Sequence, residues 1–131
     1  MSNPIQAINY IADAAINVNR IVKFGTGDRN VTTATASTDA LIGVVNELVQ
    51  PGNQAVAAGE RVDVVRFGIA WVEAGAAITR GAPLTSDGVG RAIAAAPAAG
   101  VNARIVGFAD ESASAAGDVI RFAIEPGVMQ G

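Results

Sequence analysis

The sequence contains neither cysteine nor histidine, and these two absences remove the commonest catalytic chemistry. Without a thiol there is no disulfide, no cysteine nucleophile and no thiolate ligand for a metal. Without an imidazole, the usual general base and the commonest nitrogen ligand for zinc are missing as well. Catalysis would have to come from carboxylates, hydroxyls, the single lysine or the single tyrosine. The composition therefore argues against an enzyme, and it predicts neither a metal nor a cofactor.

Aromatic residues and basic charge are also scarce. Aromatic side chains make up 5% of the 131 residues, whereas alanine accounts for 27 of them. Because alanine buries little apolar area, at roughly 25 cal/mol per Å2, we expect a thin core that gains stability from partner surfaces. The net charge of −3 and the scattered arginines argue against a nucleic-acid partner. No apolar run approaches the roughly 18 residues of a membrane span, and no secretory signal is expected at the N-terminus.

What the sequence does contain is an apparent internal repeat. The matched segments, each with its offset, are 15–16 and 77–78 (62), Arg29 and Arg91 (62), 42–47 and 106–111 (64), and 58–62 and 116–120 (58). Small differences between the offsets are what loop insertions and deletions produce. The repeat predicts one β domain over residues 15–131, built from two related half-units at about 15–74 and 75–126.

Short strand patterns separated by turn signals fill both half-units. We expect strands at 16–18, 20–24, 31–35, 41–49, 61–67, 69–72, 78–84, 91–94, 104–109 and 119–124. The alternation of polar and apolar residues in 61–67 contains one slip. Many short strands at even spacing predict an all-β fold, either a small barrel or a sandwich. The segments 46–50 and 92–99 are the two places where a short helical turn is expected.

Residues 1–14 stand outside the repeat and are expected to form an extended N-terminal arm. The spacing of their large apolar residues fits neither the helical nor the strand period. A small domain has no evident reason to display such side chains unless a surface receives them. We therefore expect the arm to order on a partner or on a neighbouring protomer, and the competing interpretation is that it folds back over an edge of its own barrel. The candidate contact residues are Pro4, Ile5, Ile8, Tyr10 and Ile11.

Two motifs suggest chemistry, and each has a simpler structural interpretation. Asp110 and Glu111 could form the carboxylate pair of a hydrolase, but adjacent residues on a regular strand point to opposite faces. Residues 25–28 (GTGD) resemble a phosphate loop, but they lack the lysine and the following helix that such a loop needs. The oxygens of Asp28 and Asn30 lack the spacing of an EF-hand and predict at most a weak surface site for calcium. A solvated strand end and a β-turn are the favoured interpretations.

A glycine followed by an acid recurs at 59–60 and 117–118, in the same place in both half-units. The functional interpretation is a charged contact displayed twice, and the favoured one is a tight turn in which glycine supplies a positive φ. Trp71 is the only tryptophan. It is expected in the core, although tryptophan is also enriched in binding hot spots.

The order of these elements resembles that of the bacteriophage capsid cement proteins, also called head decoration proteins. The segments that carry the resemblance are 41–45 (LIGVV), 58–62 (AGERV), 78–84 (ITRGAPL), 106–109 (VGFA) and 117–120 (GDVI). Each motif alone occurs in many β proteins, so the order carries the weight. The resemblance covers most of residues 15–126.

The resemblance implies a structural virion protein that binds the outer surface of an icosahedral phage head and stabilises it. It implies the major capsid protein as the partner, a homo-oligomer with a trimer expected, and synthesis in the host cytoplasm. The family supplies no catalytic residues. Two alternatives stay open. One is a phage head-completion or tail ring component, and the other is a carbohydrate-binding or hydrolytic β module, for which Trp71 and Tyr10 are too few aromatic side chains and too far apart.

Overall fold

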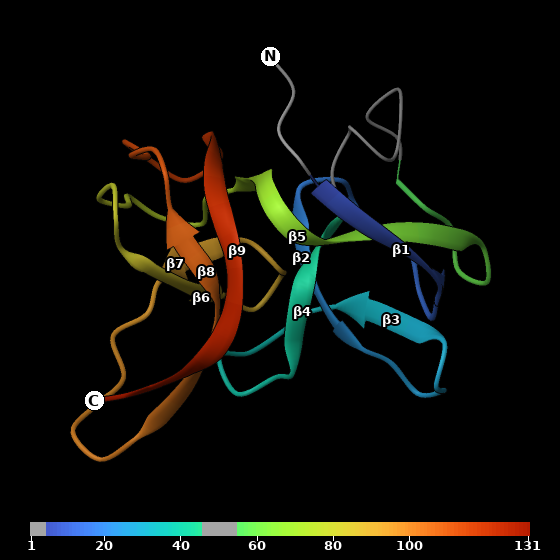
Figure 1. Ribbon diagram of the computed structural model, residues 1–131, viewed down its shortest axis with the longest axis horizontal. Helices are drawn as coiled ribbons and strands as arrows, with labels where there is room; N and C mark the ends of the chain where they lie inside the picture. Colours follow the sequence, from blue (N-terminus) through green and yellow to red (C-terminus); the bar gives the residue numbers. More distant parts are fainter. Residues whose placement is uncertain (1–4, 46–54) are drawn as a thin grey trace.

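The computed structural model describes residues 5–45 and 55–131, and all the regular elements within these ranges are strands (Figure 1). They are β1 (Ile5–Ala12), β2 (Arg20–Phe24), β3 (Asn30–Thr33), β4 (Leu41–Val45), β5 (Arg61–Glu73), β6 (Pro83–Ser86), β7 (Ala92–Ala94), β8 (Asn102–Ala109) and β9 (Val119–Gln130). The prediction of an all-β fold is confirmed. In the described part of the chain, no helix is long and apolar enough to cross a membrane.

The first five strands form a closed barrel, which we call the first barrel. Its strands follow the order β1-β3-β2-β4-β5, and an additional pairing of β1 with β5 closes it. β1 runs antiparallel to β5, with Tyr10 opposite Val62, and it meets β3 in parallel where Ala12 faces Val31. Closure leaves few unpaired edges along these strands.

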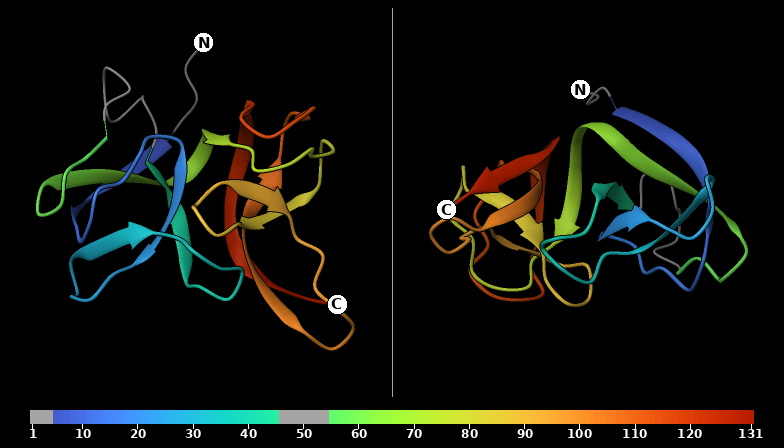
Figure 2. Two further views of the ribbon diagram at one scale, coloured as in Figure 1. Left: turned by 180° about the vertical axis from the view of Figure 1, so that it is seen from behind. Right: turned by 90° about the horizontal axis from the view of Figure 1, so that it is seen from below.

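The remaining strands form a second lobe beside the first barrel, as Figures 1 and 2 show. β9 pairs with the C-terminal part of β5, and β8, β6 and β7 follow in that order. A single parallel bridge between Ala74 and Ala92 connects the chain just after β5 with β7. β5 has 13 residues and contributes to both lobes, so it is the structural link between them.

The two lobes make corresponding strand pairs. The pairs are Tyr10–Val62 and Val72–Ile120, Val22–Gly43 and Leu84–Gly107, Phe24–Val31 and Ser86–Ala92, Ala12–Val31 and Ala74–Ala92, and Ile16–Val56 and Ile78–Ala113. Such pairs are what two related half-units would form. They include β1, whose counterpart in the second lobe is the C-terminal part of β5. This correspondence favours a repeated unit that begins at β1, earlier than the boundary after residue 14 that the sequence suggested.

The buried side chains form two clusters because several strands are covered on both faces. Adjacent residues that are both fully buried occur at Ile21 and Val22, Val44 and Val45, and Val64 and Val65. One residue of each pair belongs to the core of the first barrel, and the other belongs to the cluster that continues into the second lobe around Phe122. This double burial explains the continuous apolar run in β4, where simple alternation fails.

Some local expectations differ from the structure. The strand expected at 78–84 is replaced by an isolated bridge at Ile78 and a turn in which the Ala82 N–H donates to the carbonyl oxygen of Thr79 at 3.0 Å, and β6 begins only at Pro83. The segment 92–99 contains β7 and no helical turn. The other expected turn, at 46–50, lies outside the described residues.

Candidate functional site

The N-terminal residues expected to contact a partner occupy different environments. Pro4 lies outside the described residues, and Ile5 is the first residue of β1. Tyr10 is 9% exposed and belongs to the core of the first barrel, so its ring is not part of the surface. Ile11 is half-buried, whereas Ile8 is 38% exposed. Residues 5–12 form part of the barrel wall, and among the five candidates whose side chains are described only Ile8 presents a large exposed apolar surface.

Ile8 belongs to an exposed patch that also includes Phe24, Arg66 and Phe67, which we call the barrel-end patch. Ile8 faces Val64 across the β1–β5 ladder, and Gln6 faces Phe67 two positions further along. Because residues 6 and 8 share one face of β1, Ile8 and Phe67 lie on the same side of the sheet. Phe24 is 49% exposed and Phe67 is 64% exposed. This patch is the most aromatic part of the exposed surface.

Arg66 is held in place at the centre of the barrel-end patch. The pairing register shifts between Gln6 and Ala7, so Arg66 has no partner residue in the ladder and forms a bulge. Its Nη1 donates a hydrogen bond to the Tyr10 hydroxyl at 2.9 Å. Its guanidinium carbon lies 5.6 Å from the centroid of the Phe24 ring, within the range of a cation–π contact. Within the described ranges, no carboxylate forms an ion pair with this guanidinium.

Sequence reasoning missed Phe24, Arg66 and Phe67 as surface residues. All three were part of strand patterns, and strand patterns alone do not distinguish an exposed end of a barrel from its buried middle. The one available signal was the slip in the alternation of residues 61–67. That slip coincides with the bulge at Arg66, which redirects the side chains that follow it.

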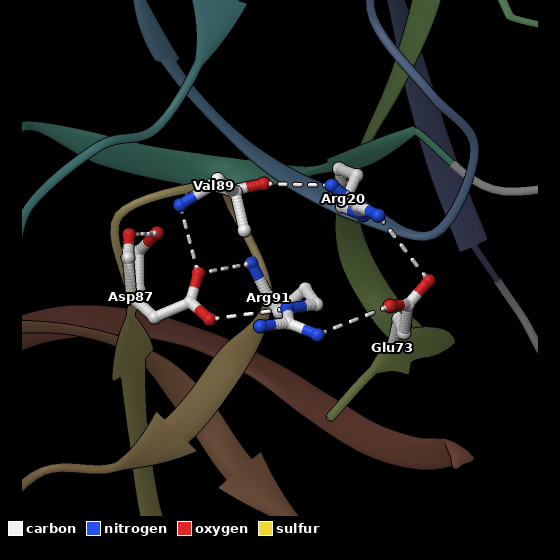
Figure 3. Close-up of polar contacts among 6 residues, drawn as sticks. Arg20, Glu73, Asp87, Val89 and Arg91 are labelled. Atoms are coloured by element: carbon white, nitrogen blue, oxygen red, sulfur yellow. Dashed lines mark hydrogen bonds and ion pairs between the residues drawn. The ribbon is translucent and has the colours of Figure 1, made fainter. Parts of the chain in front are cut away.

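A second polar cluster joins the two lobes (Figure 3). Arg20 donates from Nη1 to the carbonyl oxygen of Val89 at 2.9 Å and from Nη2 to Oε1 of Glu73 at 3.5 Å. The other carboxylate oxygen of Glu73 lies 3.9 Å from Nη1 of Arg91, and Nε of Arg91 donates to Asp87 at 3.2 Å. These side chains are at most 31% exposed. The cluster fastens the turn between β6 and β7 to strands β2 and β5.

The carboxylate pair considered for catalysis has a structural role. β8 ends at Ala109, so Asp110 and Glu111 lie in the segment after it and not on a regular strand. Both contact Arg121, with distances of 3.6 Å from Nη2 to Asp110 and 3.4 Å from Nε to Glu111. Glu111 also accepts a hydrogen bond from the backbone N–H of Arg121 at 2.8 Å. The two acids therefore hold one arginine of β9.

The repeated glycine–acid pairs form tight turns, as the sequence suggested. Glu60 accepts a hydrogen bond from the backbone N–H of Ala57 at 2.8 Å. Asp118 accepts hydrogen bonds from both the N–H and the hydroxyl of Ser114 at 2.9 Å, and these bonds lower its pKa. The acids stabilise the turns that precede them, so neither carboxylate is a displayed contact. Trp71 is half-buried and faces Arg121 of β9.

The segment 25–28 that resembled a phosphate loop is a turn closed by Asp13. The carboxylate of Asp13 accepts hydrogen bonds from the side-chain amide of Asn30 and from the backbone N–H of Thr26. The bond from Asn30 contributes most to lowering the pKa of Asp13, followed by the bond from Thr26. In the residues that the structure describes, no group of three or more acidic side chains could hold a metal ion.

Comparison with known proteins identifies the chain's relatives. The family model described as Structural cement protein (E217 gp24/Pam3 gp6) matches residues 1–125. None of the curated proteins matches the sequence. Among solved structures, the N base of the head fiber gp8.5 of bacteriophage phi29 matches with a TM-score of 0.65 at 20% identity, covering 93% of this chain and 95% of that chain. The structural likeness shows a shared fold, and the family match, which spans nearly the whole chain, shows that this chain belongs to the phage structural cement protein family.

Proposed function

We propose that the protein binds the outer surface of an icosahedral phage head and stabilises the shell. The family match over residues 1–125 is the observation that carries this proposal, because it makes the chain a structural protein of the phage virion. The polar clusters support it, because the carboxylates near the turns and at the lobe junction satisfy the protein's own backbone and arginines. What is left exposed is a binding surface and not a reaction centre.

The proposed stabilisation works by mass action. A protein that binds the assembled shell and not its dissociated subunits shifts the equilibrium towards the shell, by about 2.7 kcal/mol per site at a free concentration of one hundred times the Kd. The partner in this proposal is the major capsid protein. No catalytic step is involved, and the protein acts on the outside of the virion after synthesis in the host cytoplasm.

We also propose that the protein acts as a homotrimer. The many alanines and the few aromatics favour association, because a core of small side chains leaves stability to be gained from partner surfaces. Three linked copies would bind a shell position more tightly than one, since the first contact raises the local concentration of the other two.

Heads from the phage that encodes the protein, prepared with and without it, provide the test. We expect saturable binding of the purified protein to mature heads, no binding to unassembled capsid subunits, and a higher temperature of shell disruption for the decorated heads. Equal binding to heads and free subunits would contradict stabilisation by mass action. Light scattering tests the oligomer separately, and a mass that stays at 13.2 kDa at high concentration would contradict the trimer.

Variants of the acid pair test the absence of catalysis. Asp110→Ala and Glu111→Ala remove the carboxylates that hold Arg121, and we expect both variants to bind heads as the wild type does. A hydrolytic activity towards a polysaccharide or a phosphoester that these variants lose would show that the pair is catalytic.

A further inference from the structure

We propose that the barrel-end patch is the face that docks on the phage shell, and that it receives a segment of the shell protein in which a carboxylate stands beside large apolar side chains. This inference rests on the proposed function and specifies the surface that performs it. The patch consists of Ile8, Phe24, Arg66 and Phe67, from strands β1, β2 and β5.

The apolar part of the patch is unusual for this protein. Phe24 and Phe67 are two of only four phenylalanines, and they are 49% and 64% exposed, whereas Phe122 is fully buried. A thin core would gain stability from burying these rings, yet the fold leaves them in water. Covering them with a partner removes apolar area from water, and aromatic side chains are the residues that most often dominate the binding energy of an interface.

Arg66 indicates the chemistry of the partner. The Tyr10 hydroxyl and the Phe24 ring hold its guanidinium in place, so docking would not have to order a flexible side chain. The guanidinium carries a full positive charge, and in the described part of the chain it forms no ion pair. A partner that buries this charge must supply an acceptor, and a carboxylate matches a guanidinium in both charge and geometry.

The same charge argues against a second copy of this chain as the occupant. A two-fold contact through the patch would place one Arg66 against another, and like charges across an interface disfavour binding. The second lobe offers no duplicate of the patch either. Its strand-pair counterparts of Phe24 and Ile8 are Ser86 and Ala70, and both of these residues are buried. Each chain therefore carries one docking face of this kind.

Binding of single-site variants to heads of the encoding phage prepared without the protein tests the inference. We expect Phe67→Ser and Phe24→Ser each to weaken binding about 30-fold, as for a hot-spot side chain. Val128→Ser is the matched control, because Val128 is 60% exposed on the second lobe, and we expect less than about threefold change. Circular dichroism and the melting temperature show whether each variant is folded.

The outcomes separate this inference from the proposed function. If the wild type does not bind heads, the proposed function fails and the docking face fails with it. If the wild type binds and both phenylalanine variants bind equally well, the function stands and the docking face is wrong. An equal loss in Val128→Ser would move the contact to the second lobe. A change in oligomeric mass in Phe67→Ser would make a second copy the occupant, and that result also overturns the inference.

Two arginine variants test the carboxylate. Arg66→Gln keeps a hydrogen-bond donor without the charge, and Arg66→Glu reverses the charge. We expect both to bind more weakly than the wild type, with Arg66→Glu the weaker of the two because it faces a carboxylate of the same sign. Binding of Arg66→Glu that equals or exceeds that of Arg66→Gln would show that no carboxylate meets this position.

Discussion

Arg20 in the first barrel and Glu73 at the end of β5 form an ion pair with 3.5 Å between Nη2 and Oε1, and their side chains are only 19% and 24% exposed. Because Glu73 also attracts Arg91, one carboxylate lies between two arginines from different lobes. The backbone reinforces this junction, since the N–H of Ile21 donates to the carbonyl oxygen of Gly90 at 2.7 Å. The relative position of the lobes therefore depends on a small polar cluster as well as on the continuous strand β5.

Glu73→Gln tests the energetic weight of this cluster. The amide keeps the shape of the side chain but removes the negative charge, which leaves two partly buried arginines near each other. We expect a decrease of about 1 kcal/mol in the free energy of unfolding, more than for an exposed pair. Urea unfolding measures it, with Glu111→Gln as the control because the side chain of Glu111 is 43% exposed in its pair. Equal midpoints for the two variants would show that the junction contributes no more than a surface pair.

Gly43 and Gly107 have the same tight environment in the two lobes. A Cβ on Gly43 would meet the carbonyl oxygen of Val65, and a Cβ on Gly107 would meet that of Ala123, in both cases closer than real contacts allow. Since the obstacle is backbone, it can move only if the strands separate.

Gly43→Ala and Gly107→Ala are therefore expected to destabilise the protein strongly, by about 2 kcal/mol or more each. Gly88→Ala is the matched control, because nothing lies within 4 Å of the position of its added Cβ, and it should change stability by less than about 0.5 kcal/mol. Thermal unfolding of the three variants is the measurement. A tolerated alanine at position 43 or 107 would mean that the strands can separate there without loss.

The sequence predicted the strands that are covered by apolar neighbours, and it failed where partners decide the structure. β2, β5 and β8 were expected close to their observed positions because their apolar residues recur or run continuously. β1 was taken for an arm because its residues do not resemble their counterparts in β5. Asn9 corresponds to Trp71 and Tyr10 to Val72, so only the pairing register reveals the relationship.

The barrel-end patch and the lobe junction could not be predicted from spacing. Arg66 reaches Tyr10 across 56 positions in the sequence, and Arg20 reaches Glu73 across 53. No local pattern specifies contacts over such separations, because they form only after the sheet has closed. The exposure of Phe67 likewise depends on where the barrel ends, which is a property of the strand register.

Asp13 gives the protein a specific response to acid. The hydrogen bonds from Asn30 and Thr26 lower its pKa below the usual 3.8. A carboxyl whose folded pKa is lowered contributes its full stability above the unfolded pKa and loses that contribution as the pH falls through the folded pKa. The contribution of Asp13 is therefore complete at neutral pH and disappears progressively below pH 3.8.

Asp13→Asn is expected to unfold at a lower urea concentration than the wild type at pH 7, and the two midpoints should converge as the pH falls below 3.8. Asp28→Asn, at an exposed position in the neighbouring turn, is the control for a general change of charge. Parallel curves for Asp13→Asn and the wild type across the acid range would show that the carboxylate of Asp13 is not the group that responds.

The two lobes place an equivalent carboxylate on different strands. A Cβ on Gly25 would meet a carboxylate oxygen of Asp13, and a Cβ on Gly75 would meet one of Asp87. Asp13 and Gly75 are separated by the repeat offset of 62, as are Gly25 and Asp87. In each lobe one position carries the acid, and the other must be glycine because the carboxylate fills the space beside it. Asp and Gly have thus exchanged positions between the lobes.

This exchange predicts a rescue in a double-mutant cycle. Gly25→Asp alone should be strongly destabilising, because it places a second carboxylate in the space that Asp13 already occupies. Asp13→Gly alone should be destabilising as well, because Thr26 and Asn30 lose their acceptor. The double variant reproduces the arrangement of the second lobe, so we expect it to recover most of the stability that Gly25→Asp loses. The reverse pair, Gly75→Asp with Asp87→Gly, should be rescued less completely, because Asp87 also binds the side chain of Arg91. Urea midpoints for all six variants measure both cycles. If the losses of the single variants simply add in each double variant, the two positions are not interchangeable, and the correspondence between the lobes does not extend to their turns.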